Sequence, residues 1–598
     1  MQSRSIPKLI TTFIGIFLLH GFLSAQVINY IRTWDAAYPQ NDPNALNTAL
    51  LKDVKQATQF FDGLGRPLQT VIKQGSFETN GTAIDMVSAT VYDAFGREQF
   101  KYLPSPANNT GGNTSISDGL FKSNPFQQQA TFMAAQYGSQ GETWFYSQTN
   151  YEASPLNRVE KTMAPGNSWV GSNRGVEMKY WTNTSTDDVK KWNVANVTNS
   201  FGTYSINGFY PAGELFKNVT VDEHSKQVIE FKDKEGKAIL KKVQLTATTD
   251  DGTGRDYTGW LCTYYIYDDL NNLRCVIQPE GVKALPGLSW NLTSLLNEQC
   301  FRYEYDERNR MVMKKVPGAG EVWMVYDARD RLVLIQDANM RTQGKWMYTL
   351  YENDLNRPTS TGLWTNSSDR VYHKGQAAAS IAYPNLNGQT FEELTVTFYD
   401  NYTWLASYSN PLPSSYTNTY DTYFQPVSNS TWPYPQANSP TSQLKGLATG
   451  SRIKILGTSN YLYTVSFYDE KGRVIQVQST NITGGIDIAT TQYTWAGQPL
   501  VMVQKQQKSG GNAQTTVIVT QNTYDDLGRL VKTEKKQSNT LVNGNAMSSY
   551  KAISQLEYDK LGQLKTKKLA PAYNSNAGLE TLTYDYNIRG WMLGANRA

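Results

Sequence analysis

The residues of this chain that could do chemistry are few in kind, and the most regular are aspartates at a fixed distance from glycine and arginine. Such carboxylates can act as general acids or bases, or as calcium ligands. Histidines are scarce: His224 and His373 belong to no H-E-x-x-H motif and to no histidine–cysteine cluster. The closest approach to a serine nucleophile elbow, at 166–170, lacks the closing glycine. We therefore expect no catalytic residue, no metal site and no cofactor, although a glycosidase pair among the many carboxylates stays open.

The aspartates belong to an internal repeat. Its unit is an aromatic residue, Asp, two variable residues, Gly, Arg or a substitute, and then an apolar pair. The clear copies contain Asp62, Gly65 and Arg66; Asp93, Gly96 and Arg97; Asp469, Gly472 and Arg473; Asp525, Gly528 and Arg529; and Asp559 with Gly562. Degenerate copies lie at 231–239, 266–274, 304–312, 325–333 and 351–359.

Each unit has the pattern of a β-hairpin, with alternating residues before and after a tight turn. The Asp can accept turn N–H groups, and Gly can adopt the positive φ of a bulge residue. Copies without Gly carry Asn271, Asn309 or Asn356, which tolerate that conformation, and Asp330 once. We attribute the Arg to packing at strand edges. The spacing lacks the dense acidic loop of a calcium site, so the repeat is interpreted as structural.

The elements that must position these residues are therefore strands. The chain has 12% aromatic residues and 38 tyrosines, which suit half-buried strands because a phenol combines a flat apolar body with a polar tip. Repeats start roughly 20 to 40 residues apart, which is too irregular for a propeller. We predict an all-β fold in which hairpins form a long twisted, curling sheet, a partial shell. Unpaired edges would occur only at its ends and would invite association.

The predicted organisation has three parts. Residues 1–25 have a short basic region and an apolar run typical of a signal peptide. Residues 26–225 form an N-terminal domain, with a mostly-β inserted region at about 104–225 that includes one short helix at 123–138 and a small β-sandwich. Residues 226–598 form the hairpin array, with an aromatic insertion at about 398–440.

The aromatic insertion allows two interpretations. Exposed Tyr402, Trp404 and Trp432 could stack on sugar rings and bind a glycan. Alternatively, and in our view more simply, the aromatic side chains pack back onto the sheet.

Cysteines are too few to hold a chain of this length together. Cys262 and Cys275 flank the turn at 268–271 almost symmetrically. A disulfide between them would fit a hairpin in simple register. Alternatively, the two cysteines are unbonded and serve as small apolar residues on adjacent strands.

Charge gives little indication of a polyanionic partner. The formal net charge is +4, and it becomes +2 if Arg4 and Lys8 are removed with the signal peptide. Lysines at 532–536 and 565–568 alternate with acidic or apolar residues, as on solvated strands. We expect export to the periplasm, the cell surface or the medium, no nucleic-acid partner and no membrane segment after cleavage of the signal peptide.

The repeats resemble the RHS/YD-repeat family, whose consensus is essentially Y-D-x-x-G-R-L. The sequences TQFFDGLGRPLQTVIKQGS and VYDAFGREQFKYLPSP also resemble the domain of unknown function that opens many secreted RHS-type proteins. The resemblance implies a β-strand cocoon that encloses or displays a C-terminal effector. The family's D-P-x-G-R-[FY] motif and the variable region after it are absent, which favours a fragment of a longer product.

These observations predict a non-catalytic scaffold, the N-terminal part of a secreted shell. Its expected partners are a C-terminal effector or the rest of the shell. The alternative is a cell-surface adhesion protein that binds a glycan or another protein.

Overall fold

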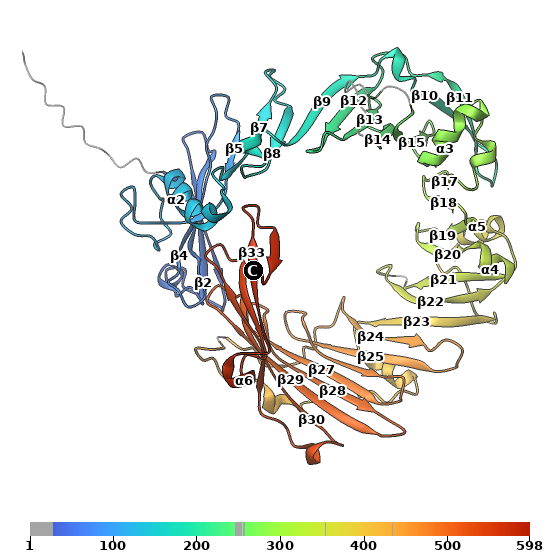
Figure 1. Ribbon diagram of the computed structural model, residues 1–598. Helices are drawn as coiled ribbons and strands as arrows, with labels where there is room; N and C mark the ends of the chain where they lie inside the picture. Colours follow the sequence, from blue (N-terminus) through green and yellow to red (C-terminus); the bar gives the residue numbers. More distant parts are fainter. Residues whose placement is uncertain (1–27, 246–253, 255–256, 353, 433, 598) are drawn as a thin grey trace, which may run out of the picture.

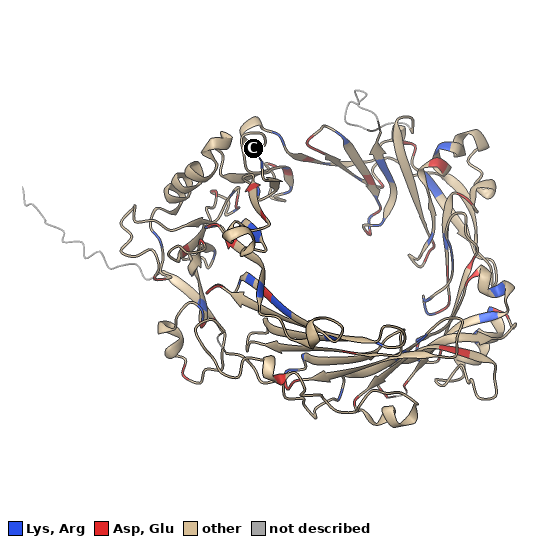
Figure 2. Ribbon diagram, turned by 60° about the horizontal axis from the view of Figure 1, so that its bottom comes forward, with Lys and Arg blue, Asp and Glu red and all other residues tan. Residues whose placement is uncertain are grey.

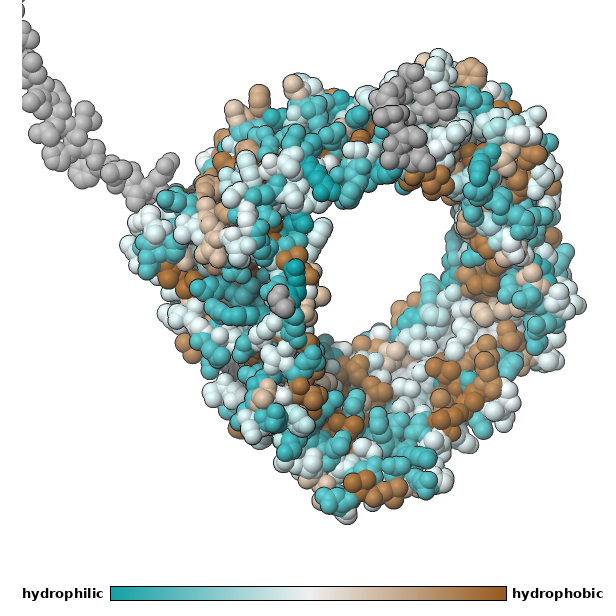
Figure 3. Space-filling view, viewed as in Figure 1, coloured by the Kyte–Doolittle hydropathy of each residue, from teal (hydrophilic) through white to brown (hydrophobic). Residues whose placement is uncertain are grey.

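The computed structural model describes residues 28–245, 254, 257–352, 354–432 and 434–597. Within them, regular structure is mostly antiparallel strand, as predicted. Figure 1 shows the strands arranged as a ring around a wide opening, and the opening passes through the molecule in the space-filling view of Figure 3. The predicted signal peptide lies outside the described residues.

The chain begins with a five-stranded sheet in the order β1-β2-β3-β4-β6. The residues of β2 alternate between buried and half-buried, so that one face packs a small core around Phe60, Val71 and Val87. Its strands are β1 (Asn29–Ala36), β2 (Val54–Phe61), β3 (Pro67–Ser76), β4 (Ile84–Ala89) and β6 (Ser105–Pro106).

The other large sheet forms the ring. Its strand order runs from β12 to β34, continues through β5, β7, β8 and β9, and returns to β12. The early strands are β5 (Phe100–Tyr102), β7 (Tyr146–Tyr151), β8 (Val159–Met163), β9 (Val176–Thr182), β12 (Phe216–Val221), β13 (Gln227–Lys232), β14 (Ala238–Gln244), β15 (Trp260–Tyr267), β16 (Leu273–Ile277), β17 (Cys300–Tyr305), β18 (Met311–Lys315), β19 (Val322–Tyr326), β20 (Leu332–Gln336), β21 (Lys345–Tyr351), β22 (Pro358–Thr365) and β23 (Phe391–Tyr399). The later strands are β24 (Ala448–Lys454), β25 (Tyr461–Tyr468), β26 (Val474–Thr480), β27 (Ile486–Tyr493), β28 (Pro499–Lys508), β29 (Gln514–Tyr524), β30 (Leu530–Asn539), β31 (Lys551–Tyr558), β32 (Leu564–Leu569), β33 (Glu580–Tyr586) and β34 (Met592–Ala595).

The curvature of the ring has a local source in the repeats. At the hairpin of β25 and β26, Phe467 pairs with Gln476, but Tyr468 pairs with Val474, so one residue is skipped. The same shift occurs next to the repeat tyrosine in the hairpins that end at Tyr267, Tyr305, Tyr326, Tyr351, Tyr493, Tyr524, Tyr558 and Tyr586. Such bulges bend a strand and increase its twist, so that repeated hairpins curl the sheet in one direction.

The helices are short. The helix predicted at 123–138 is α2 (Pro125–Tyr137), whose Met133 and Tyr137 are buried as expected. Asn124 precedes it in a left-handed conformation and makes no capping hydrogen bond. The sequence did not predict α1 (Ala45–Thr48), α3 (Pro279–Ala284), α4 (Ala338–Thr342), α5 (Arg370–Ala378) and α6 (Tyr573–Asn576). Figure 1 shows α4 and α5 on the outer side of the ring.

The predicted inserted β-sandwich is wrong. Strand β9 belongs to the ring, where it pairs with β8 and β12. Only β10 (Lys190–Ala195) and β11 (Thr203–Phe209) form a separate two-stranded sheet. This hairpin packs its Trp192 and Tyr204 against the ring core around Tyr264, because a two-stranded hairpin cannot bury an apolar face by itself.

The disulfide considered for Cys262 and Cys275 is not formed, and both thiols are free and buried. Cys275 pairs with Ile266, and Cys262 pairs with Lys242 on the opposite neighbouring strand. A bulge next to Tyr267 breaks the simple register that the disulfide would need. Burial raises the pKa of the Cys262 thiol to about 11. All three cysteines are buried in the core cluster around Tyr264, where they pack as small apolar residues.

The ring is joined where residues near the start of the chain contact the last hairpins, a region that we call the seam. In its first part, the segment 76–79 lies against the hairpin of β31 and β32. Thr79 N donates to Tyr558 O at 3.0 Å, Tyr558 N donates to Thr79 Oγ1 at 2.8 Å, and Ser76 Oγ donates to Lys560 O at 2.7 Å. Glu78 and Lys565 form an ion pair at 2.8 Å.

The second part of the seam is apolar. Ile588, in the turn between β33 and β34, is 3% exposed and packs against Met133 and Tyr137 of α2 and against Phe145. Gln140 Nε2 donates to Tyr586 O at 2.8 Å. Figure 1 shows α2 and the early strands beside the red C-terminal hairpins, so the two ends of the array support each other.

Replacement of Ile588 by Asp should open the seam, because burying a carboxylate in an apolar cluster costs several kcal/mol. We expect a larger radius of gyration in small-angle X-ray scattering and faster amide exchange at 76–79 and 558–563. Met592→Asp is the control, since Met592 lies in the same hairpin and is 60% exposed. An unchanged radius and unchanged exchange in Ile588→Asp would contradict this role of the seam.

Candidate functional site

The repeat turns are the only recurrent polar constellation that the sequence singled out, and their geometry is shared. In the copy at 469–473, Asp469 N donates to Arg473 O at 2.9 Å and Gly472 N donates to Asp469 O at 3.0 Å. Asp469 Oδ1 accepts from Lys471 N and Arg473 N, both at 2.9 Å. Its other oxygen, Oδ2, accepts from Arg473 Nε at 2.6 Å. The carboxylate is therefore fully used inside its own turn.

The same two backbone N–H bonds recur in every copy that the sequence identified with an Asp at this position. The aspartates are Asp62, Asp93, Asp233, Asp268, Asp306, Asp327, Asp469, Asp525 and Asp559. The glycines have φ between 73° and 84° in the clear copies, and Asn271, Asn309, Asp330 and Asn356 have φ of 65°, 57°, 64° and 56°. A β-carbon is strained in this region, which explains why these residue types stand there.

The arginines do more than pack at strand edges. The guanidinium of Arg331 pairs with Asp327 in its own turn at 2.6 Å and lies over the ring of Tyr351 in the next hairpin, 4.9 Å from the centroid. The Tyr351 hydroxyl in turn donates to Leu332 O, directly after the arginine, at 3.1 Å. We call this pair of contacts the Arg–Tyr link; it combines a cation–π contact with a hydrogen bond to the backbone.

The Arg–Tyr link joins hairpin to hairpin along much of the chain. It is formed by Arg66 and Tyr92, Arg97 and Tyr151, Arg158 and Tyr180, Arg310 and Tyr326, Arg331 and Tyr351, Arg357 and Tyr399, Arg473 and Tyr493, and Arg529 and Tyr558. Tyr524 and Tyr586 keep the hydroxyl bond, to Pro499 O and Leu564 O, where the preceding hairpin has Gln in place of Arg.

At the seam this link is modified. Arg529 still lies over Tyr558, but its Nη2 donates to Phe77 O at 2.6 Å, although Phe77 is 452 residues away in sequence. In ordinary hairpins, the arginine reaches a turn carbonyl of its successor, as Arg473 does with Thr494 O at 2.9 Å. At the seam, the segment 76–79 thus accepts the arginine hydrogen bond that in other hairpins goes to a carbonyl of the next repeat.

The electrostatics of the turns follow from these bonds. Backbone hydrogen bonds from Arg66 and Arg97, together with their guanidinium groups, lower the pKa of Asp62 and Asp93 below the ordinary value. Asp559 differs because Gln563 replaces the arginine. Burial raises its pKa, and nearby Glu78 raises it further, whereas Arg529 and the turn N–H groups lower it. Asp559 is therefore a turn aspartate without its own cation.

Sequence reasoning missed several turns of the same kind. Glu152 replaces Asp at 151–158, and Arg158 holds the pKa of its carboxyl at about 2 through side-chain hydrogen bonds. Thr494 takes the place of Asp at 493–498, and its Oγ1 accepts from Gln498 N at 3.0 Å. These turns share a tyrosine that is followed within seven residues by Gly or Asn and then by Arg or Gln. That pattern could have identified them, but a repeat defined by Asp three residues before Gly does not include it.

The aromatic insertion packs on the sheet. Trp404 is 8% exposed, stacks on Phe398 with ring centroids 3.9 Å apart, and donates from Nε1 to Thr449 Oγ1. Tyr402 donates to Ser466 O at 2.8 Å, and Trp432 donates to Asn522 O at 2.9 Å. Packing accounts for these three side chains without a ligand, and their binding to a glycan stays a prediction.

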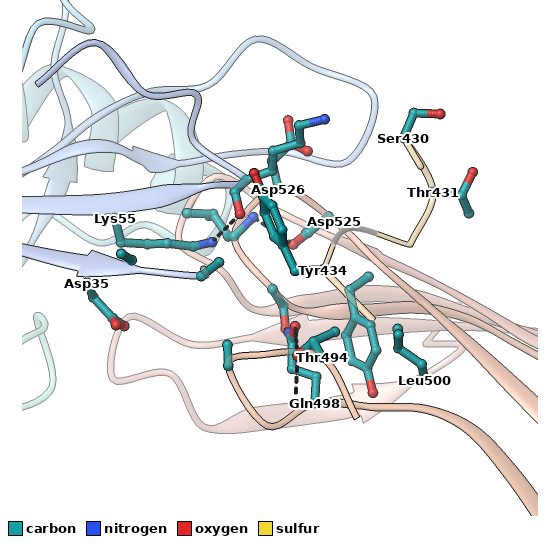
Figure 4. A pocket seen from close by; sticks show the side chains of 17 residues that line it. Asp35, Lys55, Ser430, Thr431, Tyr434, Thr494, Gln498, Leu500, Asp525 and Asp526 are labelled. Atoms are coloured by element: carbon teal, nitrogen blue, oxygen red, sulfur yellow. Dashed lines mark hydrogen bonds between the residues drawn. The ribbon is translucent and has the colours of Figure 1, made fainter. Parts of the chain in front are cut away.

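A small charged pocket of about 230 Å³ lies beside the seam. Figure 4 shows Lys55 of β2 pointing toward Asp525 and Asp526, with Tyr434 of the insertion beside it. Burial lowers the pKa of Lys55, although the surrounding carboxylates oppose that effect. Tyr434 donates to Asp53 Oδ1 at 2.9 Å and so joins the insertion to the N-terminal sheet. These groups make a third contact between the N-terminal sheet and the ring.

One of the two histidines considered in the sequence is buried. His373 is fully buried, its Nδ1 lies 2.5 Å from the Tyr383 hydroxyl, and burial lowers its pKa to about 4. No cluster of three metal-ligating side chains occurs among the residues that the structure describes. In that same part of the chain, no helix has the length and apolar character needed to cross a membrane. Figure 2 shows the positions of acidic and basic residues interspersed along the chain around the ring.

Residues 32–182 match the family model described as a domain of unknown function, DUF6443. This match confirms a domain of unknown function in the N-terminal part of the chain, and its predicted bounds of 26–225 stay a prediction. This range includes Phe77 and α2, and therefore one side of the seam. Membership of the RHS/YD-repeat family stays a prediction. No curated protein matches the sequence.

Among solved structures, the chain is similar to the crystal structure of TcdB2–TccC3, with 14% identity and a TM-score of 0.39, covering 91% of this chain and 24% of that chain. It is also similar to a pore of the Photorhabdus luminescens Tc holotoxin, with 14% identity and a TM-score of 0.40, covering 95% of this chain and 24% of that chain. The chain thus spans about a quarter of the length of these structures.

Burial of the turn ion pair should decide its contribution to stability. Asp327 and Arg331 have side-chain exposures of 0% and 7%, and Asp327→Ala leaves a buried guanidinium without its partner. We expect a loss of about 3–5 kcal/mol, measured by urea unfolding. Asp62→Ala is the matched control, because Arg66 is 36% exposed and should lose less. Equal losses in both variants would show that the turn bonds matter and that the buried ion pair does not.

Asp559 and Asp93 should affect stability with opposite signs of pH dependence. The raised pKa of Asp559 favours the protonated form in the fold, so its stabilising effect is lost as pH rises from 3.8 through the folded pKa. Asp559→Asn should therefore be at least as stable as the parent at pH 7. Asp93 has a lowered pKa, so Asp93→Asn should be destabilised at pH 7 and approach the parent as pH falls. Thermal melts at pH 3 to 7 measure both, and matching slopes would refute this assignment.

Proposed function

We propose that this chain is a non-catalytic structural scaffold, a ring segment that surrounds or presents an effector polypeptide. The observation that carries the proposal is the seam, since contacts over more than 450 residues of sequence join the ends of the hairpin array around one opening. A protein that only presented a flat adhesive sheet would not need to join its ends.

The use of the polar residues also supports a scaffold. The repeat aspartates are satisfied in their turns, and the arginines and tyrosines link successive hairpins. An active site needs groups that are free to bind substrate and exchange protons. The recurrent groups here are instead held by neighbours in the same chain.

The predicted partner is an effector, either a continuation of this chain or a separate polypeptide, and the predicted route is export by the signal peptide at 1–25. This chain is similar to the Tc holotoxin pore. We include in the proposal that it associates with toxin components.

The proposal is tested by isolating the tagged protein from the cells that produce it and imaging the particle by cryo-electron microscopy. We expect additional polypeptide density within the ring. The Ile588→Asp variant, prepared in the same way, should lose that density if the seam holds the ring closed. An empty ring in the parent particle, or an added domain tethered outside it, would contradict enclosure.

A further inference from the structure

A groove of about 970 Å³ lies between the loop 379–390 with α5 on one side and strands β21, β22 and β23 on the other. Its volume is within the range of ligand sites in proteins. The groove is separate from the seam and from the aromatic insertion at 398–440. Neither the repeat turns nor the scaffold role accounts for it.

Aromatic rings form much of the groove wall. The six aromatic lining residues are Tyr348, Tyr351, Trp364, Tyr372, Tyr383 and Phe391. Tyr348 and Trp364 are buried, which makes the floor rigid, whereas Tyr372 is 51% exposed and Phe391 is 46% exposed. Exposed aromatic rings that border a cavity provide flat apolar faces for a ligand.

Four polar groups of the lining have no hydrogen-bond partner among the described residues, whereas others, such as Ser360 and Tyr383, do. The side chains of Gln376, Asn387 and Gln389 make no hydrogen bond within the described part of the chain, nor does the Tyr372 hydroxyl. Each amide offers both donors and an acceptor.

The groove is close to neutral. Its lining contains no Lys or Arg, and its only carboxylate, Glu393, forms an ion pair with Arg452. A phosphate, a carboxylate ligand or a strongly cationic ligand would find no unpaired opposite charge. The requirement is for flat apolar faces surrounded by uncharged donors and acceptors. Sugar rings meet it, since their C–H faces stack on aromatic rings and their hydroxyls bond to amides.

We propose that this groove binds a neutral oligosaccharide. Tyr372 and Phe391 stack on sugar rings, and the side chains of Gln376, Asn387 and Gln389 bond to hydroxyls. This site goes beyond the scaffold role, and it lies outside the insertion in which the sequence suggested glycan contacts. A ring with such a groove could attach to a polysaccharide surface while its opening is occupied.

The test is calorimetric titration of the full chain with hexasaccharides of β-1,4-linked glucose, β-1,4-linked N-acetylglucosamine and α-1,4-linked glucose. We expect at least one to bind, and Tyr372→Ala and Phe391→Ala each to weaken that binding about tenfold or more. Both residues are exposed, so the fold should survive, as a thermal melt would verify. Tyr30→Ala is the matched control, because Tyr30 is 52% exposed and lies in β1, outside the groove, and should bind as the parent does.

A second measurement reports on the floor of the groove. The indole N–H resonance of Trp364, assigned with Trp364→Phe, should shift when the binding hexasaccharide is added. Absence of binding to all three sugars at millimolar concentration would overturn the proposal. So would binding that both alanine variants retain, or tighter binding of a decaproline peptide, which would identify the groove as a peptide site.

Discussion

The architecture of this protein depends on one interaction, the use of an arginine in two hairpins at once. The guanidinium neutralises the aspartate of its own turn and lies over the tyrosine of the next hairpin, as Arg331 does with Asp327 and Tyr351. A single hairpin is barely stable in water, so a contact that fixes the neighbour is as important as the turn itself. The tyrosine hydroxyl completes the link by bonding to the backbone beside the arginine.

A ring results because each linked hairpin also carries a bulge. The skipped residue beside the repeat tyrosine adds twist in the same sense at each step, and the sheet curls until its ends approach. The segment 76–79 and α2 then meet the last hairpins, and Phe77 O accepts the bond that Arg529 would otherwise give to its successor. The matched domain of unknown function therefore has a structural role here: it supplies one side of the seam.

This arrangement explains why a chain rich in carboxylates and tyrosines presents little free chemistry. Turn aspartates such as Asp469 are saturated by N–H groups and an arginine, and Asp559, which lacks the arginine, lies at the seam. The groove beside α5 differs because the side chains of Gln376, Asn387 and Gln389 make no hydrogen bond within the described chain. These amides and the exposed rings of Tyr372 and Phe391 are the basis of the proposed sugar site.

The sequence by itself determined the local structure. Asp, Gly and Arg within five residues define a turn because their hydrogen bonds span at most four positions, and Asn271, Asn309 and Asn356 could be placed at positive φ for the same reason. Helix α2 was also readable from its spacing of apolar residues. Only the tertiary structure decided that Arg357 meets Tyr399, that Trp404 is buried, that Cys275 does not face Cys262 and that Phe77 meets Arg529. These contacts depend on strand register and on the total curvature of many hairpins joined by loops of unequal length. A short stretch of sequence cannot predict them, because it determines only its own hairpin.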